Sequence, residues 1–232
     1  MKGAPAKPMR GVPPSSAVSR RTDSAMSGTS SGVLPVVVHK SLPAEVKDLK
    51  SFIEYAKKNK VNFGSWALGS SAHIFAQTLN EKYGLTIEVV TYKGEAPMWQ
   101  DMGAGQLQAA MGSPQAMNAL AVKGDVRGIA APSKVRARIF PDVPTSQEQG
   151  FMDDAFTVSG WLALAAPAAT PKDIVKKLSD TLFEAGTDEK VKALMANYLI
   201  VGPLDFEATN NVFKRDTEIM LKVMKEIGIK AE

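Results

Sequence analysis

The sequence predicts an α/β protein, and three observations support that fold class. Short apolar runs alternate with amphipathic helical patterns between residues 33 and 131. Three strand–helix units follow one another within about 70 residues, and such units build a parallel sheet with helices on its faces. The chain has 232 residues, 44% of them apolar, which is enough to bury a core of ordinary size.

The first predicted elements follow residue 33. The β-branched run Val36 to Val38 predicts a buried strand, and apolar residues at helical spacing predict a helix over residues 43–60. Further strands are predicted over residues 60–65, 85–92, 106–112 and 125–131. The helices that separate these four strands are predicted over residues 70–84, 96–105 and 114–124.

The remainder of the chain is predicted to be mainly helical. A loop over residues 140–150 leads to an apolar, strand-like run over 156–167. Helices are then predicted over residues 170–186, 188–196 and 205–228, the first opened by Thr170 and Pro171 in N-cap and N1 order.

The positive charge is concentrated at the N-terminus. Residues 1–32 contain five Lys or Arg and one Asp, so they account for the whole formal net charge of +4, and the other 200 residues are neutral. A neutral folded part argues against a nucleic-acid surface, which needs clustered cations. Because residues 1–32 are rich in Pro, Ser and Gly, we expect them to be a disordered basic tail.

Several other function classes are disfavoured by composition. There is no cysteine and there are only two histidines, so neither a thiolate nucleophile nor a Cys- or His-rich metal site is expected. We predict no cofactor. No run approaches the ~18 apolar residues of a membrane span. The N-terminus lacks an apolar signal-peptide core of about 7 residues or more, so the chain as given is expected to be cytoplasmic.

The stretch FGSWALGSSAH, residues 63–73, is the strongest candidate for a binding loop. Gly64 and Gly69 have the spacing of P-loop glycines, but Ser70 replaces the P-loop lysine. The loop joins a strand to a helix, at the edge where open α/β sheets bind ligands. Free N–H groups at the helix start, together with the hydroxyls of Ser65, Ser70 and Ser71, favour an anion such as a carboxylate over a triphosphate.

Two other strand ends resemble this one. The segment TYKGEAP passes through Gly94 into a helix, and MGSPQ passes through Gly112 and Ser113 into the next. Three helix N-termini are therefore expected at one edge of the sheet. The alternative is that these Gly, Ser and Pro residues only form turns and helix caps.

Other readings of single residues stay open at this point. Ser70 and His73 lie on one helix and suggest a nucleophile and base, against a packed or capping histidine. Lys93 is suited either to pairing with a ligand carboxylate or to solvating its loop. Trp66 lies inside the glycine-serine loop and is a candidate ligand contact, whereas Trp99 and Trp161 are expected in the core or a cleft wall.

Five segments resemble one protein family. They are GSWALGSSAH, YKGEAPMWQDMGAGQLQ, FPDVPTSQEQG, GWLALAAPAATP and the last helix before GI. Together they resemble the receptors of tripartite tricarboxylate transporters, the Bug family of solute-binding proteins. The resemblance covers residues 32–232. It implies a fold like that of type II periplasmic binding proteins, with two α/β domains that close on a small organic carboxylate and deliver it to a membrane permease, without catalysis.

The resemblance also assigns ligand contacts. The family's G-S-x-x-x-G-S-x-x-H loop falls on Gly64, Ser65, Gly69, Ser70 and His73, and its Y-K-G on Tyr92, Lys93 and Gly94. Trp66 and Ala67 stand where many members have Ser and Gly, and Val89 stands where a His is common. The candidate ligand-binding residues are therefore Gly64, Ser65, Trp66, Ala67, Gly69, Ser70, Ser71, Tyr92, Lys93, Gly94, Gly112 and Ser113.

The N-terminal region departs from the family pattern. Residues 1–32 match neither the family's export signal nor its P-x-G-G-x-x-D loop, so we expect a receptor whose first domain is incomplete. Residues 33–60 and 160–232 are expected to form the remnant of that domain, and residues 61–159 a complete second domain. A truncated remnant that binds nothing, and a Ser/His enzyme, are the alternatives to a working receptor.

Overall fold

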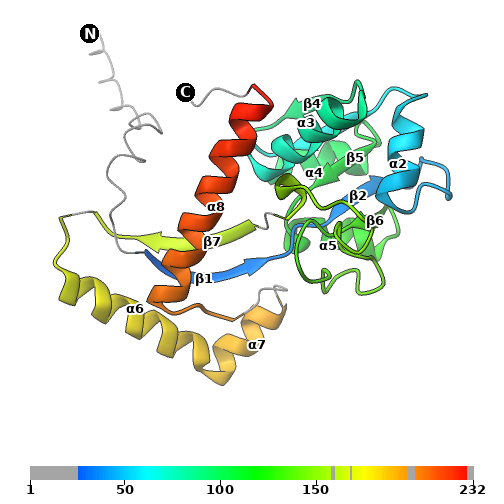
Figure 1. The fold of residues 1–232 in the computed structure, drawn as a ribbon. Helices are drawn as coiled ribbons and strands as arrows, with labels where there is room; N and C mark the ends of the chain where they lie inside the picture. Colours follow the sequence, from blue (N-terminus) through cyan, green and yellow to red (C-terminus); the bar gives the residue numbers. More distant parts are fainter. Residues whose placement is uncertain (1–25, 158–159, 168, 198–201, 229–232) are drawn as a thin grey trace, which may run out of the picture.

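The computed structural model describes residues 26–157, 160–167, 169–197 and 202–228. Figure 1 shows a larger lobe, built on a five-stranded sheet, and a smaller lobe of three helices against a two-stranded ribbon. The ribbon leads from one lobe to the other. We use "larger lobe" for residues 33–157 and "smaller lobe" for the described residues on either side of them.

The sheet of the larger lobe is mixed, with strand order β4-β3-β5-β2-β6. Strand β3 is parallel to both β4 and β5, whereas β2 is antiparallel to both of its neighbours. Strands β3, β4, β5 and β6 consequently point the same way, and their carboxyl ends share one edge. The bounds are β2 Val36–His39, β3 Asn62–Ser65, β4 Glu88–Thr91, β5 Ala109–Met111 and β6 Val126–Ala130.

Helices cover both faces of this sheet. On one face α2 (Leu49–Ala56) and α3 (Ser71–Tyr83) enclose a core that includes Phe52, Phe63 and Phe75. On the other, α4 (Glu95–Gly103) and α5 (Pro114–Val122) contribute buried methionines and Trp99. Burial of these large side chains provides most of the driving force for folding of the lobe.

Local sequence signals explain where the helices begin and end. Asp48 caps α2 in a capping box with Ser51. The Ser70 side chain caps α3, and Gly84 ends that helix in the left-handed conformation. Pro114 occupies the first turn of α5, where its missing N–H costs nothing.

The smaller lobe is built on the antiparallel pair β1 (Met26–Gly32) and β7 (Gly160–Ala165). Helices α6 (Lys172–Thr187) and α8 (Phe206–Glu226) contact β1, and α7 (Glu189–Asn197) follows α6 directly. The helix α8 also reaches the larger lobe: its C-terminal half packs around Val223 against Ile74 of α3 and Ala155 of the short helix η1 (Asp154–Phe156). This single helix therefore contacts both lobes (Figure 1).

The expected domain division is wrong for residues 33–60. Val36, Val37 and Val38 are fully buried, and their strand lies inside the five-stranded sheet rather than in a remnant of another domain. Helix α2 packs into the same core. The four strands within residues 61–159 are parallel as expected, but β2 joins their sheet antiparallel, between β5 and β6. An apolar run predicts burial but carries no information about which strands will pair with it.

The predicted tail ends earlier than residue 32. Residues 26–32 form β1, although Gly, Ser and Thr dominate the segment. Pairing with β7 supplies backbone hydrogen bonds that composition does not predict. Residues 1–25, the rest of the predicted tail, lie outside the described residues. The helix predicted from Thr170 begins two residues later, with Pro171 at the N-cap position.

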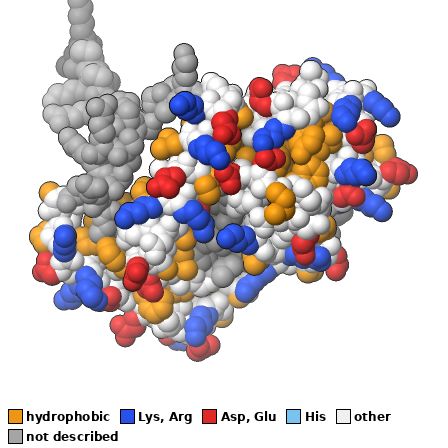
Figure 2. Space-filling view, viewed as in Figure 1, with side chains coloured by type: hydrophobic (Ala, Val, Ile, Leu, Met, Phe, Trp, Pro, Cys, Tyr) orange, Lys and Arg blue, Asp and Glu red, His pale blue; other side chains and the backbone are white. Residues whose placement is uncertain are grey.

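Apolar side chains are exposed on the smaller lobe. On α6, Ile174, Leu178 and Phe183 are 48%, 53% and 40% exposed, and Leu194 on α7 is 54% exposed. Figure 2 shows such apolar areas among Lys, Arg, Asp and Glu side chains of both signs. Among the helices described, none is long and apolar enough to cross a membrane.

Candidate functional site

The predicted loop lies at the carboxyl edge of the sheet, as expected. Strand β3 stands between β4 and β5, so the loops that follow these three strands are neighbours. The N–H of Tyr92 donates to the Ser65 carbonyl at 2.8 Å, and the N–H of Gly94 donates to the Trp66 carbonyl at 2.9 Å. These two bonds tie the segment of residues 92–94 to the loop after β3.

Three polar groups fix the shape of that loop. The Ser65 hydroxyl, which is fully buried, donates to the Ala67 carbonyl at 2.9 Å and lies 2.8 Å from the Ser70 hydroxyl. The Ser70 hydroxyl accepts from the N–H of His73, and the Ser70 N–H donates to Ala67. Ser65 and Ser70 are thus structural supports of the loop, and Trp66 packs against the main core.

The imidazole of His73 supports the loop from the helix side. Its Nδ1 accepts the N–H of Gly69 at 3.0 Å, and burial lowers the pKa of this histidine. Gly69 has a φ of +70°, which favours glycine. The Ser70 hydroxyl is bonded to Ser65 and to the backbone N–H of His73, not to its ring, so the described contacts do not include the Ser70–His73 nucleophile–base pair.

Two backbone donors remain at the start of α3. The N–H groups of Ser71 and Ala72 have no acceptor among the described residues, whereas those of Gly69, Ser70 and His73 are bonded within the loop. Both belong to the first turn, at the positive end of the helix dipole. Of these two donors only that of Ser71 belongs to a partly exposed residue, because Ala72 is fully buried.

Gly64 and Gly112 serve packing. A Cβ at Gly64 would lie 2.6 Å from the Leu107 side chain and 2.8 Å from that of Met98, and one at Gly112 would lie 2.7 Å from the Trp99 ring. Both glycines are buried. The absence of a side chain at each position lets α4, which carries Met98 and Trp99, pack closely against the sheet.

The Y-K-G segment is divided between core and solvent. The Tyr92 hydroxyl donates to the Asp101 carboxylate at 2.7 Å, and burial, aided by this bond, raises the tyrosine pKa to about 12. Lys93 is exposed and has no ion pair within the described part of the chain. Gly94 is exposed at the N-cap of α4 with a φ of +104°.

Ser113 is bonded to a side chain that sequence reasoning missed. Its N–H donates to one carboxylate oxygen of Glu95 at 2.9 Å, and its hydroxyl donates to the other. Glu95 is half-buried and lies in the first turn of α4. Its position after Gly94 suggested only a favourable charge for its own helix, because nothing in the sequence relates it to Ser113, 18 residues later.

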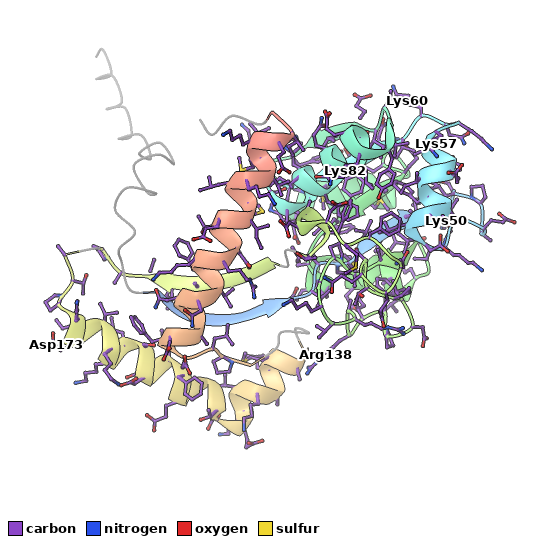
Figure 3. The ribbon with its side chains drawn as sticks, viewed as in Figure 1. Lys50, Lys57, Lys60, Lys82, Arg138 and Asp173 are labelled. Atoms are coloured by element: carbon purple, nitrogen blue, oxygen red, sulfur yellow. The ribbon has the colours of Figure 1, made fainter. Side chains whose placement is uncertain are left out.

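A cavity lies at some distance from this loop, on the side of α3 that faces α8. It has a volume of about 300 Å³ between α3, η1 and α8, and Lys82 pairs with Asp153 and Lys222 with Asp154 at its walls. Figure 3 shows Lys82 on the side of α3 toward α8, whereas Lys57 lies at the far side of the lobe. Groups of three or more acidic, His or Cys side chains that could hold a metal ion are absent from the described residues.

Comparison with known proteins identifies relatives over most of the chain. Residues 22–218 match the tripartite tricarboxylate transporter family receptor. A curated relative, the UPF0065 protein in the TAR-I ttuE-ttuC' intergenic region of Agrobacterium vitis, is 30% identical over 201 residues. That match covers 84% of this chain and 58% of the relative, so the chain spans somewhat more than half of the relative's length.

Solved structures have the same fold. The periplasmic binding protein BugD superposes with a TM-score of 0.76 at 24% identity, over 91% of this chain and 72% of BugD. The protein Rpa4515 of R. palustris, solved with adipate, gives a TM-score of 0.77 at 23% identity, over 88% of this chain and 69% of its own. These likenesses confirm the predicted α/β fold of the periplasmic-binding-protein kind. The family match covers most of the chain, which therefore belongs to the tripartite tricarboxylate transporter receptor family.

Proposed function

We propose that this protein is a solute-binding receptor for a small organic carboxylate, and that the ligand carboxylate binds the N–H group of Ser71. The observation that carries the proposal is that this donor is free on a partly exposed residue at the N-terminus of a 13-residue helix, while the N–H groups of Gly69, Ser70 and His73 are bonded within the loop and Ala72 is fully buried. A carboxylate there would gain a charge-assisted hydrogen bond and a favourable interaction with the helix dipole.

The surrounding residues support the site in different ways. Ser65, Ser70 and His73 hold the loop in shape, so the donor is oriented before ligand arrives. Lys93 and Gly94 are exposed beside the loop, and Trp66, which packs against the main core, is partly exposed. The family and the fold are those of solute-binding proteins, and Rpa4515, with the same fold, was solved with a dicarboxylate, adipate.

The remaining parts of the proposal follow from the family. Receptors of this family belong to a tripartite transporter, so the proposed partner is its membrane permease. BugD is a periplasmic binding protein, and the same compartment is proposed for this receptor when it serves a transporter. We further propose that the two lobes correspond to the two domains of such receptors, with the ribbon of β1 and β7 as their connection.

The decisive experiment removes one backbone donor without removing the helix. Ser71 is the first residue of α3, where proline is tolerated, and Ser70 has the extended conformation (φ −67°, ψ 163°) that a following proline requires. We expect Ser71→Pro to weaken carboxylate binding at least tenfold in isothermal titration with hexanoate and adipate. Its melting temperature should stay close to that of the parent.

The matched control is Ser71→Ala, which keeps the N–H and removes only the hydroxyl. Equal loss of affinity in both variants would assign recognition to the hydroxyl instead of the backbone. Full affinity in Ser71→Pro would place the anion elsewhere. If no carboxylate stabilises the parent protein in a thermal-shift panel, the receptor proposal fails and a chain that binds nothing is favoured.

A further inference from the structure

The N-terminus of α5 already holds a carboxylate that belongs to the protein. Glu95 accepts both the N–H and the hydroxyl of Ser113, the N-cap residue of α5. These are two of the groups that a helix N-terminus offers to an anion, and Pro114, the next residue, has no N–H. An anion that used the groups of Ser113 would have to displace Glu95 from both of them.

The local packing is consistent with a fixed position for this carboxylate. The Cβ position of Gly112 is 3.2 Å from a Glu95 carboxylate oxygen, so a side chain at residue 112 would crowd it. Gly94 is the N-cap of α4, so Glu95 is the first residue of that helix. The side chain therefore extends from the first turn of one helix to the N-cap of the other.

Glu95 also lies at the same edge as the proposed carboxylate site. Strand β3, which leads into α3, is flanked by β4 and β5, which lead into α4 and α5. Gly94, the residue before Glu95, donates to Trp66 in the α3 loop. A ligand on the N-terminus of α3 is thus a neighbour of a carboxylate that no described cation pairs with.

We propose that Glu95 determines specificity by occupying the second anion position, so that the receptor prefers monocarboxylates to dicarboxylates of the same length. This inference rests on the proposed carboxylate site at α3. A second ligand carboxylate would meet the charge of Glu95 at close range and would find the donors of Ser113 already used. Like charges brought together in this way lower affinity, and the effect weakens with salt.

Hexanoate and adipate provide the test, because they have six carbons each and differ only in the second carboxylate. In calorimetric titrations of the parent protein at low salt, we expect hexanoate to bind at least tenfold more tightly than adipate. The Glu95→Gln variant keeps the size of the side chain and removes its charge, and should reduce that ratio at least threefold. Glu88→Gln, at an exposed glutamate on β4 that pairs with Lys60, is the control and should leave the ratio unchanged.

The outcomes separate this inference from the proposed function. If adipate binds the parent protein as tightly as hexanoate does, or if Glu95→Gln keeps the parent's ratio, the role of Glu95 is overturned while the carboxylate site stands. If neither acid binds the parent protein, both proposals fail. Should Glu95→Gln not fold, salt titration of the parent decides: a ratio that falls with added salt supports the charge of Glu95, and a constant ratio refutes it.

Discussion

The hydroxyls of Ser65 and Ser70 lie 2.8 Å apart and join the end of β3 to the start of α3. Ser65 is the last residue of its strand and Ser70 is the N-cap of its helix. This contact closes the loop between them into a compact turn. This loop conformation fixes the direction in which the first N–H groups of α3 point.

Replacing Ser65 with alanine tests this contact. The change removes two buried hydrogen bonds, to Ala67 and to Ser70, each of which contributes about 0.5–1.5 kcal/mol. We expect the free energy of unfolding in urea to fall by about 1–3 kcal/mol. Ser71→Ala, which breaks no hydrogen bond seen here, is the control; equal stability of the two variants would show that the contact does not hold the loop.

Gly69 should resist substitution because of its backbone and not because of crowding. Its φ of +70° costs an L-residue about 1–2 kcal/mol, while a Cβ there would meet only the Met224 side chain, at 3.5 Å. Gly69→Ala should therefore be destabilised by about that amount in urea, and Gly69→Asn by less. Gly202, whose φ is not positive and whose Cβ position is open, is the control site, where alanine should have no cost.

Much of the fold followed from the sequence because its signals are local. Periodicity and caps predicted α3, α4, α5 and the three C-terminal helices near their observed ranges. Strand pairing is not a local property, and the sequence therefore misplaced Val36 to Val38 and missed β1. Both errors concern strands whose partners lie about 70 residues or more away along the chain.

The position of the candidate loop at the sheet edge could be predicted from the sequence, but the contacts of its residues could not. Gly and Ser after a strand indicate a helix start, so the loop of residues 64–71 was found from sequence. The same pattern does not distinguish glycines that admit a ligand from those that admit a neighbouring side chain, as Gly64 and Gly112 do. Glu95 was missed because its partner Ser113 is the N-cap of a different helix, α5, 18 residues later in the chain.

Stability should fall as the pH drops below neutrality, because both histidines have lowered pKa values. Burial lowers the pKa of His73, and burial together with Lys40 lowers that of His39, although Asp125 opposes the second shift. The unfolded chain then binds protons that the folded chain does not. The stabilisation is complete above the unfolded pKa of 6.5 and is lost as the pH falls through the lower folded values.

Urea unfolding between pH 5.5 and 7.5 measures this effect. Over that range the free energy of unfolding should increase with pH, and the slope should become smaller in His39→Gln and in His73→Gln. Glu148, whose pKa is lowered from 4.5 to about 2, keeps its stabilising contribution throughout this window, because that contribution is lost only as the pH falls below 4.5 toward 2. A slope that both variants leave unchanged would assign the pH dependence to other groups.

The exposed apolar side of α6 should tolerate charge, whereas its buried side should not. Ile174 and Leu178 lie one turn apart and about half of each side chain is exposed, but Val175 is 5% exposed. In the double variant Ile174→Lys, Leu178→Lys we expect the unfolding free energy to change by no more than about 0.5 kcal/mol, as at other surface sites. Binding of an environment-sensitive hydrophobic dye should decrease, because the apolar area that attracts it is interrupted.

Val175→Lys is the comparison: it buries an unpaired ammonium group and should prevent cooperative unfolding altogether. If the double variant is destabilised as severely as Val175→Lys, the α6 side chains are covered in solution and the exposed face described here does not exist in the free protein.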